Sequence, residues 1–269
     1  MKFKMTLAGS LRVQFDLGRL ASFATSFLIW SVLGLMGYRI KGLAQIRAKC
    51  SEEFKRHRGP WIICSNHLTM VDSVILAYGL QPLYKYIADF GLLPWNLPEQ
   101  KNFNRNVLLR LMCYLCKCIP VKRGGDREEM RENLEKCNWV LSEGQSLMIF
   151  PEGGRTRTGR VDRERVSYGV GRFVKDFENC KVMCIYLRGE HQESYSTVPR
   201  FGERFTMSVE TWSPERVGFN GLRAQRFYAE QIIDRIARME EEYFALHRQR
   251  HSGPDGLGEP AQGHRCTLH

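Results

Sequence analysis

The sequence predicts an α/β fold, in which a mixed, largely parallel sheet is covered by helices and preceded by an N-terminal membrane-associating helical segment. Three observations predict it. Short, continuous apolar runs alternate along the chain with segments of helical periodicity, which is typical of a sheet covered on both faces. Residues 20–38 carry no charge. The chain of 269 residues, 43% of them hydrophobic, is long enough to bury a core without disulfides.

Predicted strands and helices alternate along the chain. Gly59 and Pro60 precede the apolar run WIICS, which we interpret as a buried strand over 61–65. Asp126 is a suitable N-cap for an amphipathic helix over 126–142. The side chains of that helix predicted to face inward are Met130, Leu134, Cys137, Val140 and Leu141. The other predicted elements are helices over 72–80, 106–117, 165–177 and 222–249, and strands over 118–122, 146–150, 181–187 and 204–212.

Basic residues concentrate near the N-terminus. The chain holds 40 Lys and Arg against 29 Asp and Glu, a formal net charge of +11. Residues 1–60 hold eleven basic and three acidic residues, and therefore most of the excess. Such a balance indicates an anionic partner, namely nucleic acid, a membrane surface or a phosphorylated substrate. Because this region holds an uncharged stretch rather than a basic groove with stacking aromatics, we favour a membrane surface and expect no nucleic-acid partner.

The uncharged stretch over 20–38, LASFATSFLIWSVLGLMGY, is long enough to span a bilayer. Its apolar run starts late for a signal peptide and lacks a clear cleavage site. Basic residues flank it on both sides, which suits a segment whose two ends stay at one membrane face. We therefore expect monotopic association with the cytoplasmic face of a membrane rather than a single span. A buried core helix is the alternative.

The cysteines argue against a metal site, and the mean hydropathy argues against a polytopic membrane protein. The chain holds nine cysteines, an odd number, and several lie in apolar runs where a free thiol behaves as a small hydrophobe. This pattern favours a reducing compartment. Cys113, Cys116 and Cys118 are not followed by His or Cys at zinc-binding spacing, so we predict no metal site. A mean hydropathy of −0.35 excludes a polytopic membrane protein.

A histidine and an aspartate follow the first predicted strand. His67 leaves the strand over 61–65 at the edge of the sheet where the active sites of such folds lie. Asp72, five residues later, cannot share a continuous helix face with it. If the chain turns after the strand, however, this carboxylate can fold back onto the imidazole and make it an effective general base.

Two later strand ends carry cations beside glycines. The stretch 150–160, Phe-Pro-Glu-Gly-Gly-Arg-Thr-Arg-Thr-Gly-Arg, follows the predicted strand over 146–150. Its backbone is suited to close approach of an anion, and a solvated surface turn is the alternative. Residues 118–125 combine Lys122 and Arg123 with two following glycines. Arginine is suited to bidentate contact with phosphate.

These three elements, in this order, resemble the glycerolipid acyltransferase family, which includes 1-acylglycerol-3-phosphate and lysophospholipid acyltransferases. The resemblance covers residues 55–215. The first family block, Asn-His-x4-Asp, is matched by Asn66, His67 and Asp72. The second, an apolar strand followed by arginine, is matched by Ile119, Pro120, Val121, Lys122 and Arg123. The third, Phe-Pro-Glu-Gly-Thr-Arg-Ser, is matched by Phe150, Pro151, Glu152, Gly153 and Arg155.

The resemblance implies an O-acyltransferase of phospholipid biosynthesis. His67 would act as the general base that takes a proton from the hydroxyl of a lysophosphatidate-type acceptor, and Asp72 would orient it. The acyl donor would be acyl-CoA or acyl-carrier protein, a co-substrate, and no metal or other cofactor is required. The expected partners are a phospholipid bilayer surface, a lysophospholipid acceptor and the acyl donor. The residues implied to bind substrate are Asn66, Arg123, Glu152, Gly153, Gly154 and Arg155.

The chain departs from the family pattern at three points. Gly154 stands where the family has Thr and Thr156 where it has Ser, which shifts or removes a hydroxyl contact in this loop. The best match to the fourth block, 182–185, lacks the family's proline. Because that block shapes the acceptor pocket, other acceptors stay open: a lysophospholipid, glycerol phosphate or a lyso-aminolipid.

Two other classes of function remain as alternatives. A thioesterase-like hydrolase would use Ser65 or Cys64 beside His67, but the sequence has no Gly-x-Ser-x-Gly elbow. A non-catalytic membrane-binding protein is the other. For the organisation of the chain, we predict an N-terminal membrane-associating helical segment over 1–50, a catalytic domain over 51–250 and a disordered tail over 251–269, rich in Gly and Pro.

Overall fold

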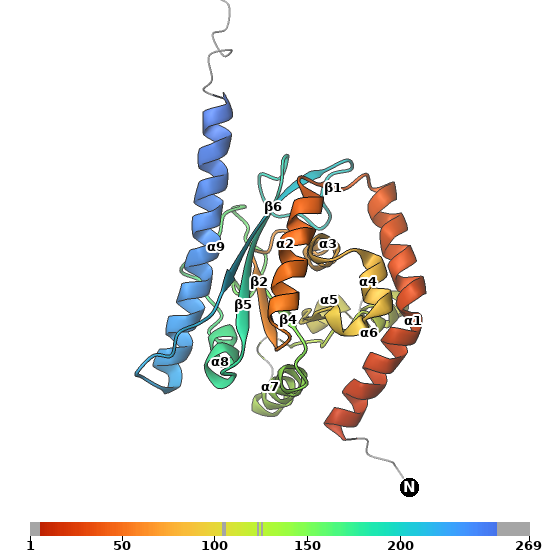
Figure 1. Cartoon of the computed structure of the whole chain (residues 1–269), viewed down its shortest axis with the longest axis vertical. Coiled ribbons are helices and arrows are strands. Elements are labelled where there is room, and N and C mark those ends of the chain that lie inside the picture. The colour runs from red at the N-terminus through yellow and green to blue at the C-terminus, as the bar shows by residue number, and fades with distance from the viewer. Residues whose placement is uncertain (1–5, 104–105, 123, 125, 252–269) are drawn as a thin grey trace, which may run out of the picture.

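The computed structural model describes residues 6–103, 106–122, 124 and 126–251 (Figure 1). Apart from residue 251, the tail that we predict to be disordered lies outside the described residues. Within them, six strands form one sheet of order β1-β6-β5-β2-β4-β3. Neighbouring strands pair parallel except β5 and β6, which pair antiparallel. The strands are β1 (Arg39–Ile40), β2 (Trp61–Ser65), β3 (Trp95–Asn96), β4 (Leu147–Ile149), β5 (Lys181–Gly189) and β6 (Arg204–Trp212). The predicted mixed, largely parallel sheet is confirmed.

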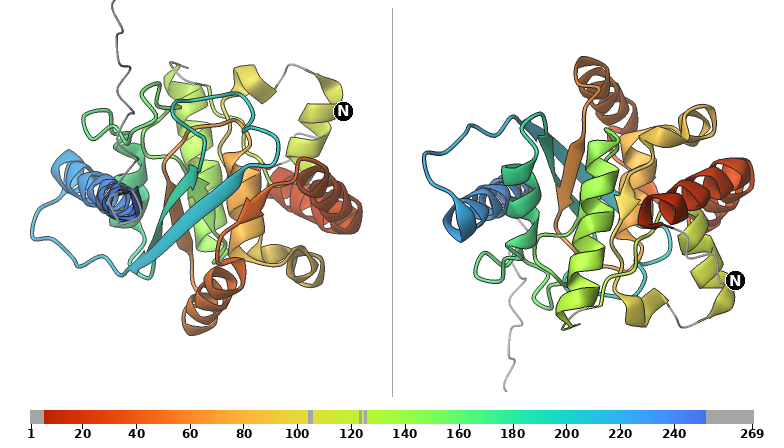
Figure 2. Two further views of the ribbon diagram at one scale, coloured as in Figure 1. Left: turned by 90° about the horizontal axis from the view of Figure 1, so that it is seen from above. Right: turned by 90° about the horizontal axis from the view of Figure 1, so that it is seen from below.

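Helices cover both faces of this sheet, as predicted. They are α1 (Leu7–Leu35), α2 (Leu43–Arg56), α3 (Asp72–Leu80), α4 (Leu83–Ala88), α5 (Gln100–Phe103), α6 (Val107–Leu115), α7 (Arg127–Ser142), α8 (Gly169–Asp176) and α9 (Gly221–His251), with a 3₁₀ turn η1 (Phe90–Leu92). Because side chains alternate along a strand, Ile62 and Cys64 pack with α7, α8 and α9, whereas Trp61 and Ile63 pack with α2 and α3. Figure 2 shows α2 and α7 on opposite sides of the sheet.

Most predicted elements are present, and two expectations are wrong. Asp126 does cap α7, since its carboxylate accepts a hydrogen bond from the backbone N–H of Glu129 at 2.8 Å. Met130, however, is exposed rather than inward. The segment 118–122 is not a regular strand and makes only isolated bridges to residues 96 and 99. Pro120 within it has no N–H to donate to a ladder.

Helix α1 begins thirteen residues earlier than the uncharged stretch and turns its polar side inward. Its buried positions include Gln14, Gly18, Ser22, Thr25 and Ser26. Gln14 Nε2 donates to the carbonyls of residues 114 and 118 at 3.0 and 2.9 Å. A Cβ on Gly18 would lie 2.5 Å from the carbonyl of residue 115, so only glycine permits this approach.

The outward side of α1 is apolar. Its exposed side chains include Leu20, Phe23, Phe27, Leu28, Trp30, Val32 and Leu35. A core helix buries such a stripe, whereas this helix presents it to the surroundings. α1 is long and apolar enough to cross a membrane by length and composition, and it is compatible with membrane association. The predicted domain boundary at residue 50 falls inside α2, where Cys50 is buried; the domain limits stay a prediction.

Candidate active site

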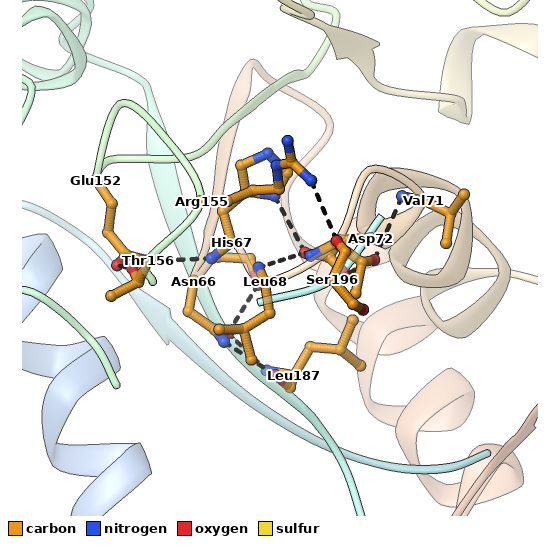
Figure 3. A network of polar contacts seen from close by, with 12 residues as sticks. Asn66, His67, Leu68, Val71, Asp72, Glu152, Arg155, Thr156, Leu187 and Ser196 are labelled. Carbon is orange, nitrogen blue, oxygen red and sulfur yellow. Dashed lines mark hydrogen bonds and ion pairs between the residues drawn. The ribbon is translucent and has the colours of Figure 1, made fainter. Parts of the chain in front are cut away.

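The two polar stretches meet at the carboxyl ends of β2 and β4. These strands are parallel neighbours, so the loops that follow them leave the same edge of the sheet. The backbone N–H of Thr156 donates to the carbonyl of His67 at 3.0 Å, which joins the two loops directly (Figure 3). His67 and Glu152 stand 85 residues apart in the chain, and the sheet brings them together.

His67 and Asp72 form a pair, as the turn after β2 predicts. His67 Nδ1 lies 3.1 Å from Asp72 Oδ2. The same oxygen accepts the backbone N–H groups of Leu68 and Thr69 at 2.7 and 2.8 Å, and the Thr69 hydroxyl donates to Oδ1. Asp72 is buried at the first turn of α3, where the helix dipole favours a carboxylate. Four donors therefore fix its position.

The imidazole of His67 keeps one edge open. Its side chain is 19% exposed and stacks on the ring of Phe150, with centroids 4.1 Å apart and planes 20° apart. With Nδ1 facing a carboxylate, the neutral ring carries its proton on Nδ1 and presents a lone pair at Nε2. This is the arrangement that general-base catalysis requires.

Asn66 joins β2 to β5. Its amide nitrogen donates to the carbonyl of Leu187 at 2.9 Å, and its amide oxygen accepts the N–H of Leu187 at 2.8 Å. The side chain is buried. These contacts hold the backbone just before His67, so Asn66 positions the loop that carries His67; substrate contact through Asn66 stays a prediction.

The buried carboxylate of Glu152 connects the loop after β2 with the loop after β4. Its carboxylate accepts the backbone N–H of His67 at 2.9 Å and that of Asp162 at 3.3 Å, and it accepts the hydroxyl of Thr156. The hydroxyl contact in this loop is therefore made by Thr156. Burial raises the pKa of Glu152 from 4.5 to about 7, although these donors oppose the rise. Substrate contact through this buried carboxylate stays a prediction.

The raised pKa of Glu152 predicts a pH dependence of stability. Between pH 4.5 and about 7 the folded protein keeps a proton that the unfolded chain has released, so the free energy of unfolding falls as the pH rises. We expect the wild type to lose on the order of 3 kcal/mol relative to Glu152→Gln across this range. Chemical denaturation of both proteins at several pH values measures it, and parallel curves would contradict it.

The remaining predicted residues lie in the loop after β4, with one exception. Gly153 has φ +63°, a conformation that favours glycine, and its N–H donates to the carbonyl of Phe150 at 3.0 Å. Gly154 and Arg155 are half-buried. Arg155 Nη1 donates to the carbonyl of Ser196 at 3.2 Å. Arg123, the exception, lies outside the described residues.

Three contributors to the site were not predicted. Thr69 fixes Asp72, Phe150 supports the imidazole, and the segment around Ser196 holds Arg155. Thr69 stands three residues before Asp72, a spacing like that of the Ser/Thr and acidic residue in a capping box, which could have identified it. Ser196 follows a different strand, and no local pattern links it to the site.

The hydrolase alternative is weakened by burial. Ser65 and Cys64 are both fully buried within β2. The Ser65 hydroxyl donates to Asn66 Oδ1 at 3.3 Å, and burial raises the pKa of the Cys64 thiol. A nucleophile must reach its substrate and be activated by a base. Neither side chain meets these conditions.

Comparison with known families gives one match. A family model described as Acyltransferase matches residues 45–188. This is more than half of the chain, and it contains both the His67–Asp72 pair and the loop that carries Glu152 and Arg155. A comparison with curated proteins gives no match.

Proposed function

The chain belongs to the acyltransferase family of glycerolipid and lysophospholipid enzymes, and from this premise we propose that it transfers a fatty acyl group from an acyl thioester to the hydroxyl of a lysophosphatidate-type acceptor in phospholipid biosynthesis. The observation that carries the proposal is the His67–Asp72 contact, with one imidazole edge open. A lysophospholipid, glycerol phosphate or a lyso-aminolipid is the alternative acceptor.

In the proposed mechanism, His67 Nε2 takes the proton of the acceptor hydroxyl as its oxygen attacks the thioester carbonyl. The C–O ester bond forms, the C–S bond breaks, and the imidazolium returns the proton to the leaving thiolate. The products are an ester and a free thiol. Asp72 supports the imidazolium while it exists. Because a thioester is already activated, the reaction requires alignment of the two substrates and no cofactor.

Arg155 is the proposed contact for the acceptor phosphate. We expect Arg155→Ala to raise the KM for the acceptor about ten- to hundredfold, the size of one lost charge-assisted hydrogen bond, with a much smaller effect on the acyl donor. Arg157→Ala is the matched control, because Arg157 is an exposed arginine of the same loop. Equal effects on both substrates, or no effect, would mean that Arg155 serves the fold or contacts the phosphates of CoA. Steady-state kinetics with each substrate varied in turn measures the difference.

A membrane surface is the proposed site of action. The acceptor is an amphiphile that stays in a bilayer, so the enzyme must reach the interface. The outward apolar side of α1 and the cations of residues 1–60 supply the two kinds of attraction that stable anchoring needs. We propose monotopic association with the cytoplasmic face, with a single span as the alternative.

The experiment that tests the function is an acceptor screen with the purified full-length protein. One acyl-CoA is offered with lysophosphatidate, a neutral lysophospholipid, glycerol phosphate or a lyso-aminolipid, and release of free thiol is followed. We expect release that requires an acceptor and is fastest with lysophosphatidate. Release at the same rate without any acceptor would instead establish a thioesterase.

A further inference from the structure

The segment between β5 and β6 forms part of the rim of the His67 site. The N–H of Ser196 donates to the carbonyl of Leu68, and the N–H of Met70 donates to the carbonyl of Thr197, both at 3.1 Å. Arg155 donates to the carbonyl of Ser196 from the opposite loop. The segment is therefore bonded to both catalytic loops, as Figure 3 shows for Ser196.

This rim exposes large apolar side chains. Tyr195, Val198 and Phe201 are all exposed, and the side chain of Phe201 is 71% exposed. We call residues 195–202 the rim loop. Three large apolar groups within seven residues, beside an active site, are the kind of patch that marks an interaction surface.

The rim loop continues the apolar side of α1. The N–H of Gly202 donates to the carbonyl of Met36, and the Tyr38 hydroxyl donates to the carbonyl of Pro199, both at 2.8 Å. The exposed Leu35 ends α1 next to these contacts. Figure 1 shows the C-terminal end of α1 beside β1 and the turns that precede β6. The apolar surface therefore runs from α1 onto the rim of the site.

Cations border this surface. Arg200 lies within the rim loop and is exposed. Arg39 and Arg204 are register partners of β1 and β6, and both are exposed. Of the neighbouring acids, Glu190 pairs with Lys41, and Glu203 is buried and accepts backbone N–H groups. Glu193, two residues before the rim loop, is exposed, so the three arginines outnumber the exposed acid. Apolar side chains bordered by arginines complement an anionic bilayer.

We propose that the rim loop is a second membrane-contacting element. Val198 and Phe201 enter the boundary between headgroups and acyl chains, and the three arginines contact anionic headgroups. The rim of the active site then lies at the bilayer, so that a lipid acceptor reaches His67 without leaving it. This inference rests on the proposed function for its purpose, but the membrane contact itself is tested independently of acyl transfer.

The first test measures contact with lipid. Phe201→Trp is compared with Leu222→Trp, both in the full-length chain carrying Trp30→Phe, because Trp30 lies on the apolar side of α1. Leu222 is 74% exposed and begins α9, on the side of the molecule away from α1 (Figure 1). Vesicles of phosphatidylcholine and phosphatidylglycerol carry brominated acyl chains that quench tryptophan. We expect added quenching for Phe201→Trp and none for Leu222→Trp; equal quenching of the two would overturn the proposal.

The second test measures delivery of the acceptor. Phe201→Ser is compared with Leu222→Ser on acceptor embedded in vesicles and on a short-chain acceptor dissolved as monomers. For Phe201→Ser only, we expect the rate on the vesicle-embedded acceptor, divided by the rate on the monomeric acceptor, to fall roughly tenfold. The reason is that one large apolar contact with the interface is lost. An unchanged ratio would overturn the proposal. The proposal would also be overturned if Phe201→Ser and the wild type differed in oligomeric state without lipid, since the rim loop would then join two copies of the chain. If no acyl transfer occurs at all, the proposed function fails while the quenching test still decides the membrane contact.

Discussion

Replacing His67 with alanine is expected to lower acyl transfer about ten-thousandfold, toward the rate without general-base catalysis. The acceptor hydroxyl is a weak nucleophile until its proton is removed, and the open edge of the His67 imidazole is the group positioned to remove it. The measurement is release of free thiol at fixed concentrations of acyl-CoA and acceptor. The loss should appear in kcat, since the imidazole acts in the transition state.

The substitution should leave the fold intact. The His67 side chain is partly exposed and belongs to a loop rather than to the core, and the backbone N–H of residue 67 still donates to Glu152. His191→Ala is a matched control, because His191 Nδ1 also faces a carboxylate, that of Glu203 at 3.3 Å, but its side chain is 58% exposed and outside the site. Near wild-type thiol release by His67→Ala would refute the mechanism. If Cys64→Ala or Ser65→Ala were the lethal change, a hydrolase would be the better explanation.

The sheet and its covering helices could be predicted because their signals are local. The run 61–65 is apolar up to its final serine, 204–212 alternates, and Asp126 caps a helix with its apolar residues at helical spacing. Residues 118–122 look apolar enough for a strand, but Pro120 interrupts the ladder. The sequence does not show that β6 pairs antiparallel with β5 while the other neighbouring strands pair parallel. That arrangement depends on tertiary packing, which no local pattern encodes.

The candidate site was predicted in part for the same reason. His67 and Asp72 lie five residues apart, so one turn brings them together. The buried position of Glu152 and the inward polar side of α1 depend on contacts with distant segments: Asp162 and Thr156 for the first, and residues 114 and 118 for the second. Composition alone predicts that a polar group faces water. Where distant segments supply enough hydrogen-bond partners, the polar group is buried instead.

Asp72→Asn is expected to lower kcat about a thousandfold, a loss of about 4 kcal/mol of transition-state stabilisation. Asp72 Oδ2 accepts three hydrogen bonds, from His67 Nδ1, Leu68 N–H and Thr69 N–H. An amide oxygen placed there keeps these acceptor contacts but carries no charge to support the imidazolium. An amide nitrogen placed there would face backbone donors, and the ring would lose the acceptor that fixes its tautomer.

The Asp72 prediction separates positioning from binding. Because Asp72 is buried behind His67 and contacts the chain rather than the open edge of the ring, the KM values for donor and acceptor should change little while kcat falls. Asp176→Asn removes an exposed α8 carboxylate paired with Arg172 and is the matched control. Thermal denaturation of each variant accounts for any loss of folded protein. A rise in acceptor KM with kcat preserved would mean that Asp72 serves substrate binding, and the catalytic pairing with His67 would have to be abandoned.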